Sequence, residues 1–202
     1  MSDPQTAKAQ IRATVTRELR RLTAEDRHAC STRACHRLAS TDIWQHAVTI
    51  LAYAPRADEL DLGPLIDDAL QSGRRVALPR FDPDSGRYQA RQIVVPIADL
   101  APGHYGIREP DHDSPSVSMN LLDLILVPGV AFDLTGRRLG RGRGYYDQLL
   151  ANVRAVKCGL AFDQQVMAQI PVESHDVMLD CVLTPERWLD FRRLRRGDDL
   201  VG

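Results

Sequence analysis

Apolar residues recur at helical spacing near the start of the chain. In residues 5–23 they fall every three or four positions from Ile11 to Leu22, which places them on one face of a helix. The basic residues between them are expected to form its solvated face. Similar patterns predict further helices at residues 32–47 and 59–73, the second ending at a glycine.

Short apolar runs rich in β-branched residues alternate with these helices. Residues 48–55, 74–80 and 121–129 each form such a run that reaches a proline, and residues 155–162 form a fourth. Each run predicts a buried strand. Strands that alternate with helices favour an α/β fold with a largely parallel sheet covered on both faces. We therefore expect a single domain over residues 1–202, with a charged tail that frays from about residue 189.

In sheets of this kind, ligands bind beyond the carboxyl ends of the strands. The polar residues that follow the predicted strands are therefore the first candidates for a site: residues 56–61, Arg80 and the segment from Phe132 onward. Residues 82–120 are rich in proline and glycine and are expected to form loops that leave the scaffold.

The composition of the chain limits which classes of binding partner are expected. The 202 residues include 26 basic and 27 acidic side chains and carry a net charge of −1, so the total charge calls for neither nucleic acid nor an anionic membrane. No apolar run approaches the roughly 20 residues that span a bilayer. The four cysteines lack CxxC or zinc-ligand spacing, and no apolar signal segment opens the chain. We expect a cytoplasmic protein with reduced thiols.

Residues 132–150, FDLTGRRLGRGRGYYDQLL, hold four glycines among four arginines between a predicted strand and a predicted helix. Glycines let backbone N–H groups approach a ligand, and a helix N-terminus adds unpaired N–H groups. Arginines supply planar donor forks for phosphate or carboxylate oxygens. The segment therefore predicts an anion site, with phosphate as the expected occupant. The alternative is a structural glycine-rich turn, which clustered arginines disfavour because they repel one another without an anion.

An acidic residue, Asp147, follows this loop one turn into the predicted helix. A carboxylate beside a phosphate site commonly binds Mg²⁺, because the metal bridges carboxylate and phosphate oxygens. The later segment PVESHDVMLD offers Glu173, Asp176 and Asp180 as a second oxygen ligand, although it could equally be a surface turn. His175 in that segment is expected to form only hydrogen bonds.

The segment LILVPGVAFDLTGRRLGRGRGYYDQLL resembles the signature of the 5-formyltetrahydrofolate cyclo-ligase family, also called methenyltetrahydrofolate synthetase. In that family a strand, a PG(V/L)AFD turn and RLGxGxGYYD occur in this order. Shorter resemblances keep the family's order: KAQIR to KxxLR, YAPRADELD to YxPxxxEvD, VALPR to a strand ending in PR, YGIREP to GIxEP, and PVESHDVMLDCVLTPE to the closing PxExHD segment. Together they cover residues 8 to 185.

The resemblance implies a reaction and a fold. Family members convert 5-formyltetrahydrofolate and ATP, with Mg²⁺, to 5,10-methenyltetrahydrofolate, ADP and phosphate, through phosphorylation of the formyl oxygen and attack by N10. Their fold is a three-layer α/β/α sandwich. Such an enzyme needs no protein nucleophile, because the substrates supply the reacting groups.

The resemblance also implies roles for individual residues. ATP would be bound by Lys8, Arg12, Arg138, Leu139, Gly140, Arg141, Gly142, Arg143, Gly144, Tyr145 and Tyr146. The folate would contact Ala54, Glu59, Arg141, Gly142, Arg143, Gly144 and Tyr145, with Glu59 on the pterin side. Arg141, Arg143 and Tyr146 would act in the chemical step, and Asp147 and Asp176 would bind Mg²⁺. In the segment after VALPR, Tyr88 is the aromatic residue available to the substrate.

Two other classes of function remain open from the sequence. The same loop could serve as the anion clamp of a sugar-phosphate or nucleotide binding module, which would have no use for two converging acids. The run RRLGRGRGYY could also bind single-stranded RNA, since arginines with aromatics do so. The near-neutral charge disfavours RNA. We expect a monomer that binds small molecules and neither nucleic acid nor membrane.

Overall fold

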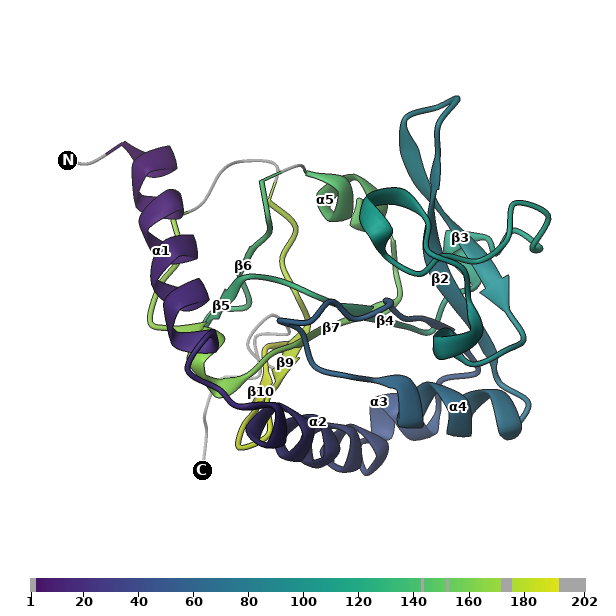
Figure 1. Ribbon diagram of the computed structural model, residues 1–202, viewed down its shortest axis with the longest axis horizontal. Coiled ribbons are helices and arrows are strands. Elements are labelled where there is room, and N and C mark those ends of the chain that lie inside the picture. The colour runs from purple at the N-terminus through teal and green to yellow at the C-terminus, as the bar shows by residue number, and fades with distance from the viewer. Residues whose placement is uncertain (1–2, 143, 152, 172–175, 193–202) are drawn as a thin grey trace.

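The computed structural model describes residues 3–142, 144–151, 153–171 and 176–192. The strands of its main sheet are β1 (Thr49–Leu51), β2 (Arg75–Asp82), β3 (Arg87–Ile93), β4 (Leu124–Val127), β7 (Val156–Leu160), β9 (Cys181–Leu183) and β10 (Trp188–Asp190). Their order is β10-β9-β7-β4-β1-β2-β3 (Figure 1). The five inner strands run parallel, and the edge strands β3 and β10 are antiparallel to their neighbours. The α/β fold expected from the sequence, with its mostly parallel sheet, is confirmed.

The helices are α1 (Pro4–Leu19), α2 (Ala24–Ala39), α3 (Asp42–Gln45), α4 (Gly63–Gln71) and α5 (Tyr145–Leu150), and short 3₁₀ turns lie at Ile97–Asp99, His104–Gly106, Met119–Leu121 and Asp163–Gln165. Side chains cap the first two helices. Asp3 accepts a hydrogen bond from the N–H of Thr6 at the start of α1, and Thr23 and Asp26 form a capping box at the start of α2. The capping box explains why α2 begins well before residue 32, where the sequence predicted it.

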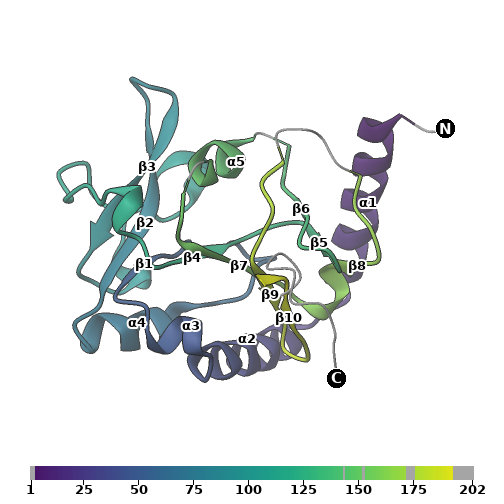
Figure 2. The same cartoon turned by 180° about the vertical axis from the view of Figure 1, so that it is seen from behind.

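The two faces of the main sheet pack against different layers. Helices α2, α3 and α4 cover one face, and α5 lies over the other (Figures 1 and 2). Neighbouring side chains of β1 point to opposite faces of the sheet. Ile50 packs with Leu38 and Ile66 in the core on one face, and Leu51 packs with Leu150 in the core on the other. Each of these side chains is at most 1% exposed. The result is the expected sandwich of three layers, in which α5 forms a thin third layer.

A second, smaller sheet lies beside α1 and consists of β6 (Arg138–Leu139), β5 (Ala131–Asp133) and β8 (Val166–Met167), in that order. The buried Asp133 carboxylate organises the turn between β5 and β6, since it accepts backbone N–H bonds from Thr135 and Arg137 at 2.9 and 3.0 Å. Gly136 completes the turn with φ of +89°, where a Cβ would lie 2.8 Å from Phe191. The first half of the glycine-arginine segment is therefore the structural turn that the sequence left open as an alternative.

Three expectations need correction. Pro79 lies inside β2 and not at its end; β2 pairs with β1 only as far as Ala77, so the missing N–H of proline leaves no gap in that ladder. Residues 82–120 contain β3, which the sequence prediction missed, in a hairpin with β2. The tail does not fray from residue 189, because β10 pairs with β9 and Phe191 is only 4% exposed. Residues 193–202 lie outside the described residues.

Candidate active site

A pocket of about 570 Å³ opens beyond the carboxyl ends of β1 and β4, between α1 and the β2–β3 hairpin. Every described residue to which the family resemblance gives a binding, catalytic or metal role lines it: Lys8, Arg12, Ala54, Glu59, Arg138, Leu139, Gly140, Arg141, Gly142, Gly144, Tyr145, Tyr146, Asp147 and Asp176. Arg143 lies outside the described residues. Segments at opposite ends of the chain thus converge where the parallel sheet predicts a ligand site.

Helix α1 contributes two basic side chains to one end of the pocket. Lys8 and Arg12 stand four positions apart and so lie on the same helical face. The Lys8 side chain is almost fully buried, and its Nζ lies 3.3 Å from Oδ2 of Asp176. The Nε of Arg12 donates to the carbonyl oxygen of Gly140 at 3.0 Å. These contacts tie the first helix to the glycine-arginine loop and to the last segment that lines the pocket.

Arg138 and Asp147 form a second ion pair in the pocket wall. Nη2 of Arg138 lies 2.8 Å from Oδ1 of Asp147, with side chains 4% and 20% exposed. The guanidinium also stands 5.6 Å from the ring centre of Tyr146, close enough for a cation–π contact. A Cβ at Gly140 would come within 3.0 Å of Nη1 of Arg138, so glycine here leaves room for the guanidinium.

The second half of the glycine-arginine segment forms the pocket loop. Gly142 and Gly144 adopt φ of +95° and +66°, in the left-handed region that favours glycine. Gly144 leads directly into α5, which has only six residues. The sequence predicted that the N-terminus of this helix would support an anion site. A helix this short adds little, so positive charge in this part of the pocket comes mainly from the arginine and lysine side chains.

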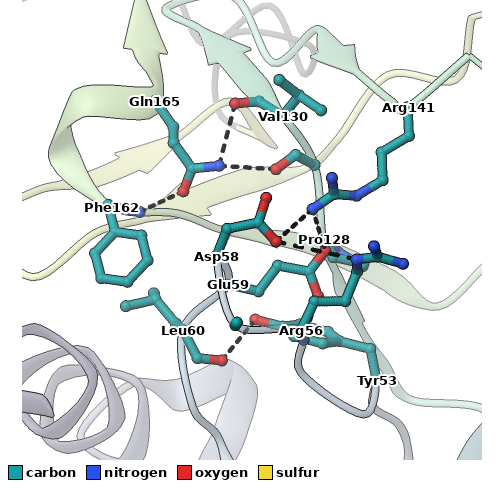
Figure 3. A network of polar contacts seen from close by, with 12 residues as sticks. Tyr53, Arg56, Asp58, Glu59, Leu60, Pro128, Val130, Arg141, Phe162 and Gln165 are labelled. Carbon is teal, nitrogen blue, oxygen red and sulfur yellow. Dashed lines mark hydrogen bonds and ion pairs between the residues drawn. The ribbon is translucent and has the colours of Figure 1, made fainter. Parts of the chain in front are cut away.

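Glu59 occupies the segment that follows β1 (Figure 3). Its Oε2 accepts the backbone N–H of Arg56 at 3.0 Å, and its Oε1 lies 3.3 Å from Nη2 of Arg141. The same nitrogen of Arg141 lies 2.7 Å from Oδ1 of Asp58. Burial raises the pKa of Glu59, and the neighbouring charge of Asp58 adds to this, while the Arg56 N–H and Arg141 oppose it. A buried carboxylate with this surrounding is suited to accept N–H donors from a ligand.

Two tyrosines near Glu59 are kept neutral. Burial raises the pKa of Tyr146 above its usual value, and the charge of Glu59 raises it further. Burial likewise raises the pKa of Tyr53, whose hydroxyl donates to the carbonyl oxygen of Leu60 at 3.3 Å. Tyr146 can therefore offer a hydroxyl hydrogen-bond donor at neutral pH, but it cannot act as a phenolate base.

Aromatic side chains form the opposite wall. Tyr88, on β3, meets Tyr145 edge to face with ring centres 5.1 Å apart. Tyr105 also lines the pocket, from a turn in which its φ is +57°. Arg108 and Glu109 follow it in the lining. The sequence prediction named Tyr88 and Tyr145 but missed Tyr105, Arg108 and Glu109, although the YGIREP segment that carries these three was part of the family resemblance.

Two carboxylates of the pocket are candidate oxygen donors for a hard divalent cation. Asp147 and Asp176 both line it, whereas Asp180 instead accepts the backbone N–H of Lys157 at 2.8 Å and holds two strands together. Glu173 and His175 lie outside the described residues. No group of three or more His, Cys, Asp or Glu side chains with metal-site geometry occurs among the residues that the structure describes. A cation would thus need further oxygens from a ligand, as Mg²⁺ commonly takes from phosphates.

Comparison with known proteins decides the family. The model of the 5-formyltetrahydrofolate cyclo-ligase family matches residues 4–185. The chain belongs to this family. Curated members include the 5-formyltetrahydrofolate cyclo-ligase of Mus musculus, 32% identical over 88% of this chain and 93% of the relative. That of Escherichia coli (strain K12) is 34% identical over 83% of this chain and 94% of its own length.

Solved structures agree with this assignment. The 5,10-methenyltetrahydrofolate synthetase of Aquifex aeolicus superposes with a TM-score of 0.84 at 32% identity, over 96% of each chain. The synthetase of Mycoplasma pneumoniae gives a TM-score of 0.70 at 20% identity, over 89% of this chain and 99% of its own, which supports the fold alone. In the part of this family member that the structure describes, no helix has the length and apolar character needed to cross a membrane.

Proposed function

We propose that the protein catalyses the ATP-dependent cyclisation of 5-formyltetrahydrofolate to 5,10-methenyltetrahydrofolate, with release of ADP and phosphate. The main support for the proposal is that residues from distant parts of the chain converge on one pocket. The family's signature residues, from α1, the segment after β1 and the β6–α5 loop, line one pocket with cationic side chains toward α1 and aromatic ones on the opposite wall. The family assignment supplies the reaction.

The pocket suits the chemistry of a formamide. The formyl carbon of the substrate is a poor electrophile, so the formyl oxygen first attacks the γ-phosphorus of ATP and ADP leaves. N10 then attacks the activated carbon and loses its proton, and the C–O bond breaks to release phosphate. Both steps spread negative charge over phosphate oxygens, which preorganised cations stabilise without a covalent intermediate on the protein.

The cationic side chains have separate parts in this proposal. Lys8 and Arg12 bind the phosphates of ATP from the face of α1, and the glycines of the loop let its backbone N–H groups approach the same oxygens. Arg138 and Arg141 stabilise the charge that develops on the transferred phosphoryl group. Arg143 is assigned the same role from the family resemblance. Tyr146 donates its hydroxyl to the reacting oxygens.

Glu59 binds the pterin ring, whose amide and amino N–H groups can pair with its carboxylate. Asp147 and Asp176 would hold Mg²⁺, and the charge of the ion would offset that of the phosphate oxygens. Tyr88, Tyr145 and Tyr105 offer aromatic faces to the rings of the folate. We also retain four predictions from the sequence: one domain over residues 1–202, a monomer, a cytoplasmic location, and no nucleic-acid partner.

A direct assay tests the proposal. Purified protein is mixed with 5-formyltetrahydrofolate and Mg·ATP, and the absorbance of the methenyl product is followed over time. We expect product only when nucleotide and Mg²⁺ are both present. Full turnover in EDTA without nucleotide would contradict the proposal, and so would binding of both substrates with no product, which would instead indicate a binding module.

A further inference from the structure

Asp58 lies beside the candidate pterin-binding Glu59 and contacts the same arginine (Figure 3). Nη2 of Arg141 is 2.7 Å from Oδ1 of Asp58 and 3.3 Å from Oε1 of Glu59. One guanidinium nitrogen is thus shared between two carboxylates, and the shorter contact belongs to Asp58. Asp58 is not among the residues that line the pocket.

The two carboxylates stand in different surroundings. The side chains of Asp58 and Arg141 are 40% and 42% exposed, whereas that of Glu59 is only 9% exposed. The second oxygen of Glu59 already accepts the backbone N–H of Arg56 at 3.0 Å. Within the described part of the chain its first oxygen makes only the longer contact to Arg141, so this oxygen is the one that a ligand's N–H donor can take over most easily.

We infer that Asp58 is a positioning residue for folate recognition: it holds Arg141 at the rim of the pocket and keeps the contact of that cation with Glu59 at the longer distance of 3.3 Å. This inference rests on the proposed function. While Asp58 takes the shorter contact, Glu59 can turn its oxygen to the pterin, and Arg141 stays beside the reacting groups. Without the charge of Asp58, Glu59 becomes the only carboxylate partner of Arg141 among the residues that the structure describes. The cation then competes with the pterin for the same oxygen.

The variant Asp58→Asn tests this directly. It should raise the KM for 5-formyltetrahydrofolate roughly three- to fivefold, the size that one exposed charge pair can supply. The KM for ATP should stay within about twofold, because Lys8, Arg12 and Arg138 hold the nucleotide independently of Asp58. Asp58→Glu restores the charge and should recover most of the folate affinity. The melting temperature should change little for either variant, since the pair is exposed.

A double-mutant cycle shows whether Asp58 acts through Arg141. In the Arg141→Gln background the guanidinium is absent, so Asp58→Asn should no longer change the KM for the folate. Glu186→Gln provides the matched control: it removes an exposed pair with Arg33, at 3.1 Å, outside the pocket, and should alter neither KM.

The outcomes separate the inference from the proposed function. A wild-type protein that makes no methenyl product would overturn the proposed function and the inference with it. Wild-type turnover combined with an unchanged folate KM in Asp58→Asn would overturn the inference alone. An equal rise in KM with and without the Arg141 side chain would also overturn it, because Asp58 would then act by another route.

Discussion

Nη2 of Arg138 lies 2.8 Å from Oδ1 of Asp147, in a pair that is almost buried on the arginine side. The pair joins the first residue of β6 to the first turn of α5 across the pocket loop. Asp147 therefore has two parts to play in our proposal. It neutralises a buried cation in the free protein, and it would provide a carboxylate oxygen for Mg²⁺ when ATP is bound.

The variant Asp147→Asn should lower kcat by at least about a hundredfold, because the amide keeps the shape of the carboxylate but not the charge that holds the metal. It should also destabilise the fold by roughly 1–3 kcal/mol, since Arg138 would keep a buried charge without its partner. Kinetics at varied Mg²⁺ and thermal unfolding would measure the two effects.

Arg138→Gln provides the comparison for Asp147→Asn. It breaks the same ion pair but leaves the candidate metal ligand in place. Only the variant at Asp147 should raise the Mg²⁺ concentration needed for half-maximal rate. If both variants shift this concentration equally, Asp147 acts through the ion pair and not through the metal.

The basic face of α1 allows a second prediction. Ala at Lys8 or Arg12 should raise the KM for ATP more than the KM for the folate, because both side chains line the cationic end of the pocket. Arg20 and Arg21 are exposed residues that directly follow α1, and Ala at either should change stability by no more than about 0.5 kcal/mol and leave both KM values unchanged. Steady-state kinetics on the four variants is the measurement. Equal behaviour of all four variants would mean that Lys8 and Arg12 do not bind ATP.

The sequence predicted the scaffold well where hydrophobic pattern decides structure. The buried parallel strands consist of continuous apolar runs, and β1, β4 and β7 all fall inside the predicted segments. The sequence predicted less where a strand is defined by its pairing with a neighbouring strand. Strand β3 has the mixed polar sequence RYQARQI, and its regularity comes from its hairpin with β2 and from the turn that Asp82 and Gly86 stabilise. Because β3 has no continuous apolar run, the sequence pattern did not reveal this edge strand.

The sequence could predict which residues belong to the site, but not which of their side chains contact one another. A glycine-arginine loop and an acid one turn later are local patterns, so the residues from Arg138 to Asp147 could be named from the sequence. Contacts such as that between Lys8 and Asp176 join positions 168 residues apart, and only the folded chain brings them together. Arg141 likewise contacts both Asp58 and Glu59 because two loops meet in the folded chain. The spacing of these residues in the sequence does not predict that contact.

Glu59→Gln tests the folate end of the pocket. The amide keeps the size of the side chain but replaces one acceptor oxygen with a donor, which would face a donor of the pterin. Folate binding should weaken by about 1.5–3 kcal/mol. ATP binding should change little, because the phosphates contact other residues. Calorimetric titration with 5-formyltetrahydrofolate measures the difference. An unchanged dissociation constant would mean that Glu59 does not bind the pterin and serves only to accept the hydrogen bond from the Arg56 N–H.

The raised pKa of Glu59 leads to the last prediction, on pH dependence. Burial disfavours the charged carboxylate, so in the fold Glu59 takes up a proton at a pH above the usual 4.5 of the free side chain. The groups that act on this pKa are Asp58, which raises it, and Arg141 with the Arg56 N–H, which lower it. Nearby Tyr53 and Tyr146 stay neutral, because their own pKa values are raised.

Folate affinity should therefore fall as the pH drops through this raised value, because protonated Glu59 loses an acceptor for the pterin. The stability effect has the opposite direction. Since the folded state binds this proton more tightly than the unfolded chain, the contribution of Glu59 to stability decreases as the pH rises from 4.5 through the folded pKa. Relative to Glu59→Gln, the wild type should gain stability on acidification while it loses folate affinity. Paired melting curves and folate titrations at a series of pH values would show both trends. Parallel curves for the two proteins across the series would mean that another group controls the pH dependence.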